Sequence, residues 1–103
     1  MRRIFIFREG NMMGAMVGPD LVRGVGGFGP SIKDALYALA AEFQEHGYRL
    51  TPPAVVEVAG TTVEAYGYSP LGILNRLAEA IAGYREEDFP PLNWQEIGWE
   101  PPV

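Results

Sequence analysis

A glycine-rich segment contains the pattern that comes closest to a cofactor site. Residues 24–29 read GVGGFG, which satisfies G-x-G-x-x-G between a predicted strand and a predicted helix. Such a turn binds the pyrophosphate of a dinucleotide at the helix N-terminus, and an acid about 20 residues further on binds the ribose. The chain reads YRLTPP over residues 48–53, where that acid should stand. We therefore interpret the glycines as letting a twisted strand bulge and turn, and keep small-ligand or anion binding at the Gly24–Gly29 turn as an alternative.

The residues that could support catalysis or bind a metal are few. His46 is the only histidine, and there is no cysteine. One imidazole without thiolates does not form a zinc site of the usual ligand set. A Ser-His-Asp triad would need His46 beside Ser31 or Ser69, but both serines stand where helix N-caps are expected. The sequence therefore predicts no enzyme, no metal site and no cofactor, and places His46 at a helix end.

Acidic residues are the main candidates for contacts with a partner. The formal net charge is −5, and the eight basic residues form no cluster beyond Arg2-Arg3. This balance argues against a nucleic acid as the partner, whereas an acidic surface steers a basic protein toward it. The alternative is that the charge only keeps the protein in solution. The predicted contact residues are Glu42, Glu45, Glu86, Glu87 and Asp88, together with Trp94 and Trp99 of the last segment.

The last segment, residues 86–103, is predicted to form a C-terminal strap rich in proline and tryptophan. It contains both tryptophans, Trp94 and Trp99, interspersed with prolines. Aromatic residues among prolines make a stiff apolar segment that loses little entropy on docking. We expect it to cover a face or edge of its own sheet. We also expect a homo-oligomer, and in the alternative function of a self-assembling structural protein Trp94 and Trp99 contact a second subunit.

Two amphipathic helices must position these residues. Apolar side chains recur at helical spacing in two segments, and each segment follows a serine that can act as N-cap. These signals predict helices over about 32–46 and 70–84. Gly47 is a typical residue to end the first, and Pro70 suits the first turn of the second.

Strands account for most of the remaining chain. The expected element order is β-β-β-α-(β)-β-β-α, with a mainly antiparallel sheet and both helices on one face, which is an α+β fold. A hairpin turn is expected at Gly60-Thr61. The predicted strands are residues 4–7, 12–17, 21–28, 55–58 and 62–66.

The length and composition of the chain are those of one domain, residues 1–103. With 48% hydrophobic residues, the chain can bury a single core. Only four apolar residues follow Arg2-Arg3, too few for a signal peptide, and no apolar run approaches the ~20 residues of a membrane span. We therefore expect a cytoplasmic protein without a membrane partner, in keeping with the absence of cysteine.

The two halves of the chain share a pattern. Residues 28–31 and 66–69 both read aromatic, Gly, any residue, Ser, and the leucines of the two predicted helices then coincide. This match predicts a second strand-strand-helix unit over residues 54–85. The alternative is that shared helical periodicity alone produces the likeness.

Residues 19–36, PDLVRGVGGFGPSIKDAL, resemble the N-terminal domain of HicB-type antitoxins. The PDL sequence matches the opening turn of that family. Gly29 and Ser31 match the start of its helix, and the DAL sequence at 34–36 matches the first helical turn. The resemblance covers about residues 2–50, so residues 1–50 form the HicB-like unit.

This resemblance implies both a fold and a function. It implies a β-β-β-α-β unit related to a partial double-stranded-RNA-binding domain, and a protein that neutralises a small basic toxin that cleaves RNA. Two features depart from the family: Pro30 replaces its usual acid, and no helix-turn-helix or ribbon-helix-helix pattern follows residue 50. From the resemblance and the lack of catalytic residues, the predicted function is a non-enzymatic, HicB-like protein-binding module.

Overall fold

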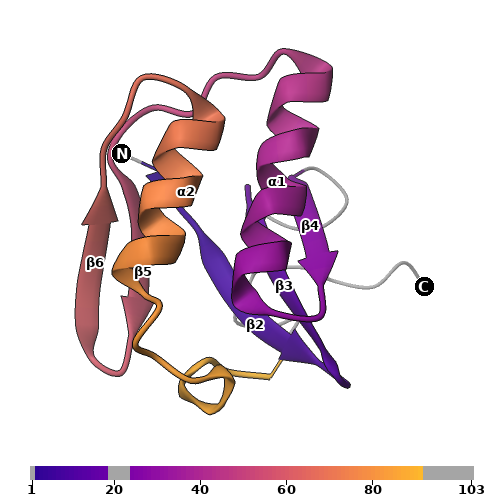
Figure 1. Ribbon diagram of the computed structural model, residues 1–103, viewed down its shortest axis with the longest axis vertical. Coiled ribbons are helices and arrows are strands. Elements are labelled where there is room, and N and C mark those ends of the chain that lie inside the picture. Colours follow the sequence, from indigo (N-terminus) through magenta and orange to yellow (C-terminus); the bar gives the residue numbers. More distant parts are fainter. Residues whose placement is uncertain (1, 19–23, 92–103) are drawn as a thin grey trace.

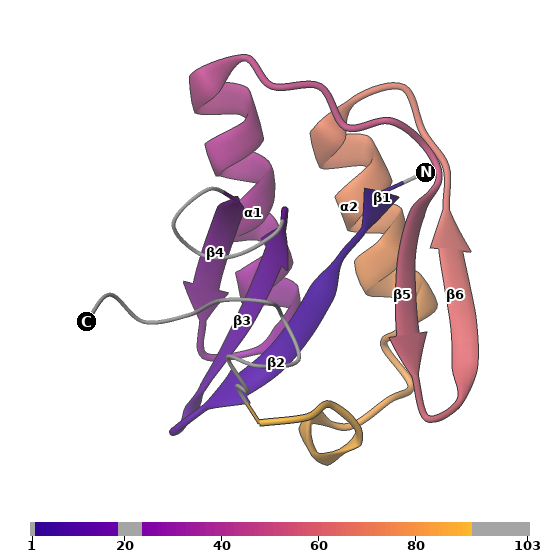
Figure 2. The same cartoon turned by 180° about the vertical axis from the view of Figure 1, so that it is seen from behind.

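The protein consists of two helices packed on one face of two small β-sheets. The computed structural model describes residues 2–18 and 24–91. Both helices lie in front of the strands in Figure 1 and behind them in Figure 2. This arrangement confirms the predicted α+β class and the placement of the helices. The elements in chain order are β1 (Arg2–Arg3), β2 (Phe5–Glu9), β3 (Met12–Val17), β4 (Val25–Gly29), α1 (Ile32–His46), β5 (Ala54–Val58), β6 (Thr61–Ala65), α2 (Pro70–Ala80) and the 3-10 helix η1 (Glu86–Asp88).

The first two strands, β1 and β2, lie in different sheets. In one sheet β3 lies between β2 and β4 and is antiparallel to both. In the other, β5 is parallel to β1 and antiparallel to β6. Ile4 joins β1 to β2, and its amide donates a hydrogen bond to the carbonyl of Val55 at 2.8 Å. Most strand pairs are therefore antiparallel, as expected, and the parallel pair β1–β5 ties the second half of the chain to its first residues.

Helix α1 begins and ends where the sequence predicted. The hydroxyl of Ser31 accepts a hydrogen bond from the amide of Asp34 at 3.1 Å and donates one to its carboxylate at 2.7 Å. Gly47 ends the helix in the left-handed conformation, with φ of 67°. Glycine adopts this conformation without a steric penalty, which explains its place there. Residues 47–53 then lead to β5 without forming the optional strand of the predicted order.

Replacing Ser31 with alanine is expected to lower the free energy of unfolding by about 1 kcal/mol, because an amide at the start of α1 loses its acceptor. Chemical denaturation followed by circular dichroism measures this change. Ser31→Asp keeps an acceptor at the N-cap and should retain most of the stability. Equal destabilisation by both substitutions would show that the cap is not the cause.

Helix α2 starts as predicted but is four residues shorter, ending at Ala80 rather than 84. The hydroxyl of Ser69 caps it by accepting from the amide of Gly72 at 3.1 Å. Beyond Ala80 the backbone changes to tighter turns, in which the amide of Tyr84 bonds the carbonyl of Ile81 three residues earlier. Such i to i−3 bonds are usual where a helix unwinds at its C-terminus.

One strand and one turn differ from the prediction. The strand expected over 21–28 begins, in the described residues, at Val25 and ends at Gly29. It pairs with β3 in unbroken register over its whole length, so the expected bulge is not present within β4. The hairpin turn between β5 and β6 is Ala59-Gly60, with φ of 51° and 77°, rather than Gly60-Thr61. Positive φ at both central positions is typical of a type I′ turn, which matches the twist of the strands.

A single buried core is shared by both halves of the chain. Its apolar side chains come from both sheets and both helices. The two segments that read aromatic, Gly, any residue, Ser also have a common role. A Cβ on Gly29 would lie 2.5 Å from Cβ of Asp34, and one on Gly67 would lie 3.1 Å from the side chain of Ile73. Each glycine therefore lets the chain pass close to the helix that follows, while an origin by duplication stays a prediction.

Candidate functional site

The acidic residues predicted to contact a partner form two groups at opposite ends of the molecule. Glu42 and Glu45 lie in the last turns of α1, and Glu86, Glu87 and Asp88 form η1. In Figure 1 the C-terminal end of α1 is at the top, and η1 is the small orange turn at the bottom. The five carboxylates therefore do not form one continuous surface.

The upper acidic group surrounds the only histidine. Nε2 of His46 lies 3.3 Å from the carboxylate of Glu42, and its ring stacks on Tyr48 with centroids 5.2 Å apart. The possible ligand atoms of Glu42, Glu45 and His46 lie within 4.8 Å of one another. Three ligands from one helix face, none of them buried, leave a tetrahedral ion open to solvent, and we assign no metal site to them. The predicted place of His46 at a helix end is confirmed.

The lower acidic group is held in place on both sides. The amide of Arg85 donates to the carboxylate of Asp88 at 2.8 Å. Phe89 follows η1 directly and is buried, with 1% of its surface exposed. The side chains of Glu86 and Glu87 are exposed, and within residues 2–18 and 24–91 neither forms an ion pair. The short helix therefore presents these two carboxylates at the surface from a fixed position.

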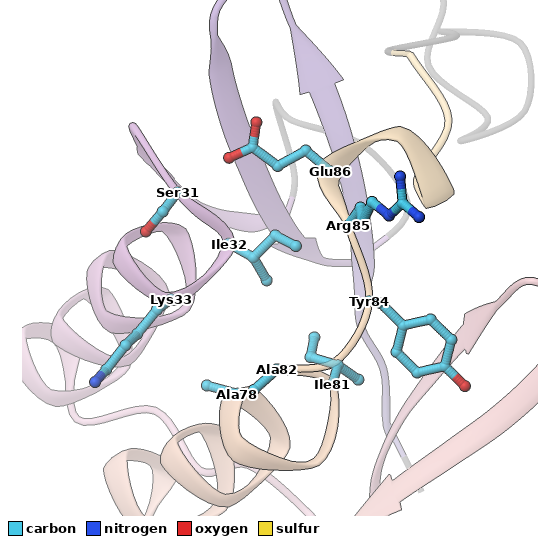
Figure 3. Close-up of a pocket in the computed structure, with 9 residues that line it drawn as sticks. All are labelled: Ser31, Ile32, Lys33, Ala78, Ile81, Ala82, Tyr84, Arg85 and Glu86. Carbon is cyan, nitrogen blue, oxygen red and sulfur yellow. The ribbon is translucent and has the colours of Figure 1, made fainter.

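Beside η1 lies a hollow that the sequence analysis did not find. It has a volume of about 330 Å³ and separates the start of α1 from the C-terminal end of α2. Its apolar lining consists of Ile32, Ala78, Ile81 and Ala82. In Figure 3 Ile32 points toward the alanines and Glu86 reaches over one side, while the charged ends of Lys33 and Arg85 point away. The hollow therefore has apolar walls and an acidic side chain at its rim.

One signal for this hollow is present in the sequence. Ala78 and Ala82 are four residues apart around the C-terminal end of α2, a spacing that in a continuing helix puts two small side chains on one side. Small residues leave space only if a neighbouring element stands at the right distance. The pairing of the start of α1 with the end of α2 supplies that neighbour, and it depends on the tertiary fold.

The glycine-rich segment has a packing role. A Cβ on Gly27 would overlap the backbone of α1, at 2.7 Å from the carbonyl carbon of Ala38 and 2.8 Å from the carbonyl oxygen of Ala35. The glycines thus allow β4 to approach the helix closely, which corrects our interpretation that they permit a bulge. The N-terminus of α1 already carries the carboxylate of Asp34, hydrogen-bonded to the hydroxyl of Ser31. An anion placed there would face this negative charge.

The first residues of the C-terminal strap lie on their own domain. The backbone amide of Arg8 donates to the carbonyl of Pro90 at 2.8 Å, and its Nε donates to the carbonyl of Phe89 at 2.8 Å. Pro91 forms an isolated parallel bridge with Arg8. These contacts cover the edge of β2 that faces away from β3. Trp94 and Trp99, predicted to bind a partner or a second subunit, lie outside the described residues.

Comparisons with known proteins identify no relative. No family model, curated protein or solved structure matches the chain. In the part of the chain that the structure describes, no helix combines the length and the apolar character needed to cross a bilayer. The function is therefore inferred from the geometry of the described residues and from the sequence pattern at 19–36.

Proposed function

We propose that the protein is a non-enzymatic, HicB-like binding module that neutralises a small basic partner of the RNA-cleaving toxin type. The order of the first elements supports this proposal. If β1 and β2, which Ile4 joins, are counted as one strand, residues 2–46 follow the order β-β-β-α. The resemblance at residues 19–36 implies this order followed by one more strand; residues 47–53 form none, and the next strand is β5 of the hairpin. The hairpin β5–β6 and helix α2 occupy the part of the chain in which many members of that family carry a DNA-binding segment.

The observation that carries the proposal is the acidic turn η1. It presents consecutive carboxylates at one end of the molecule, and Glu79 is exposed in the last turn of α2. A local negative potential raises the rate at which a basic protein associates, by about 10- to 1000-fold in known cases. A protein that cleaves RNA needs basic residues to bind phosphates. The charge of η1 is therefore complementary to the proposed partner.

Reversing the charge of η1 is expected to release such a partner. The tagged protein would be captured from its native host at low salt, and bound proteins identified by mass spectrometry. We expect a stoichiometric basic protein that salt displaces, because exposed charges are screened over about 10 Å at 0.1 M salt. The double variant Glu86→Lys with Glu87→Lys should reduce its association rate about tenfold or more. Asp88 is left unchanged because it accepts the hydrogen bond from Arg85.

The proposal places the contact at η1 and leaves out Glu42 and Glu45, which lie at the far end of α1. The matched control is therefore the double variant Glu42→Lys with Glu45→Lys, which makes the same charge change there. It should leave capture and association rate almost unchanged. Equal loss in both variants would mean that only the overall charge matters and would remove the assignment to η1. Recovery of the tagged protein alone, as a defined oligomer, would contradict the proposed function and favour self-assembly.

A further inference from the structure

We propose that the hollow between α1 and α2 receives one apolar side chain from a basic segment of the partner, whose flanking Lys or Arg residues contact the acids of η1. This inference rests on the proposed function and adds to it the place of contact and the chemistry of the segment bound. The hollow lies directly beside η1, and Glu86 belongs to both. One segment can therefore reach the apolar and the acidic groups together.

The shape of the hollow favours an apolar anchor. Ile81 is 1% exposed and belongs to the buried core, so the hollow opens onto side chains that are already packed. Ala78 is also mostly buried, whereas Ala82 is exposed at the edge. An aliphatic side chain placed between Ile32 and these alanines would lose water contacts on several sides at once. Burial of apolar area in a small pocket with a polar rim is typical of the residues that dominate binding energy.

The charges around the hollow select basic neighbours for that anchor. Of the three charged side chains that line it, Glu86 reaches over the hollow, whereas Lys33 and Arg85 point away from it (Figure 3). The ammonium group of Lys33 lies 5.7 Å from the ring of Tyr37, further along α1. Glu79 and Glu87, each next in sequence to a residue that lines the hollow, are also exposed. A segment that carries Lys or Arg beside its anchor therefore meets carboxylates at the rim.

The volume of the hollow indicates whether it can hold a single side chain or a larger ligand. Pockets for drug-sized molecules and cofactors measure about 300–1000 Å³ and bury most of the ligand. The hollow, at about 330 Å³, is at the lower limit and is only partly enclosed. It therefore suits one or two side chains of a protein segment and not a dinucleotide.

Two synthetic pentapeptides test this inference directly on the full chain. Both have Lys or Arg at four positions; the central residue is Leu in one and Ser in the other. We expect the Leu peptide to bind about tenfold more tightly, from the burial of its central side chain. In NMR titrations its largest shifts should be at the amides of Ile32, Ala78, Ile81 and Ala82. Equal binding of the two peptides, or shifts centred elsewhere, would overturn the inference.

A matched pair of variants separates filling of the hollow from a general change of surface. Ala82→Trp places a large side chain at the edge of the hollow, and Ala80→Trp places the same side chain at an exposed position that does not line it. The first should abolish the preference for Leu over Ser, and the second should keep it. Loss in both, or in neither, would contradict the inference. A thermal melt of each variant verifies that it is folded.

These experiments distinguish a failure of the hollow as the anchor site from a failure of the proposed function. If the host protein is captured and released by the η1 variant, but Ala82→Trp binds it with unchanged Kd, the hollow is not the anchor site and the proposed function stands. If the Leu peptide binds at the hollow but no basic host protein is captured, the proposed function fails and the hollow remains a site for apolar segments.

Discussion

Replacing Gly27 with alanine is expected to lower the free energy of unfolding by about 3 kcal/mol or more. The added Cβ would overlap the backbone of α1 at Leu39 and lie 2.7 Å from the carbonyl carbon of Ala38. Backbone atoms cannot rotate away as a side chain can, so either the helix or β4 must shift. Overpacking typically costs 1–3 kcal/mol, and a backbone clash belongs at or above the upper end of this range.

Urea denaturation and thermal melting measure this loss. For a domain of this length, 1 kcal/mol corresponds to a change in Tm of about 4–8 °C, so Gly27→Ala should melt at least about 12 °C lower. The matched control is Gly83→Ala, because a Cβ at Gly83 would have nothing within 4 Å. That control should change stability by less than about 0.5 kcal/mol. A Gly27→Ala protein as stable as the wild type would show that α1 does not lie against β4 as described.

Truncation of Leu77 to alanine is expected to cost about 2–5 kcal/mol. The side chain is fully buried, with 0% of its surface exposed, in the core shared by the two halves of the chain. Its removal loses apolar burial and leaves a cavity, since packed neighbours relax only in part. Because β1 and β5 tie the two halves together, we expect one cooperative transition in which both halves unfold at the lower denaturant concentration.

Leu71→Ala is the matched control on the same helix. Leu71 is 40% exposed, so the same change of side chain should alter stability by about 0.5 kcal/mol or less. Fluorescence and circular dichroism, recorded on the same samples, report whether unfolding is a single transition. Two separate transitions in Leu77→Ala would indicate that residues 54–85 form an independent unit, contrary to the shared core.

The acidic residues show how far a sequence pattern can locate a site. Their charge and their position at helix ends could be read from the sequence, and the structure places Glu42 and Glu45 in α1 and residues 86–88 in η1. Their separation to opposite ends of the molecule could not be read, because it depends on the direction in which α1 crosses the sheet. Charge reversal at Glu86 and Glu87, compared with charge reversal at Glu42 and Glu45, tests that separation.

Local signals were sufficient for the helices. Each has a serine N-cap and an apolar stripe, and these interactions join residues only a few positions apart. The boundaries of α1 were therefore predicted to the residue. The end of α2 was not, because the turns after Ala80 follow the docking of Ile81 and Phe89 in the core, which are contacts with distant parts of the chain.

The sequence alone determined the α+β class, the two capped helices and the acidic character, since each depends on neighbouring residues or on composition. The tertiary structure alone decided the role of Gly27 and the hollow beside η1. The absence of a Cβ at Gly27 matters because the backbone of α1 lies directly against it. The small residues at the end of α2 leave a hollow only because Ile32 lies opposite them. Both depend on distances between segments far apart in the chain, which no local pattern encodes.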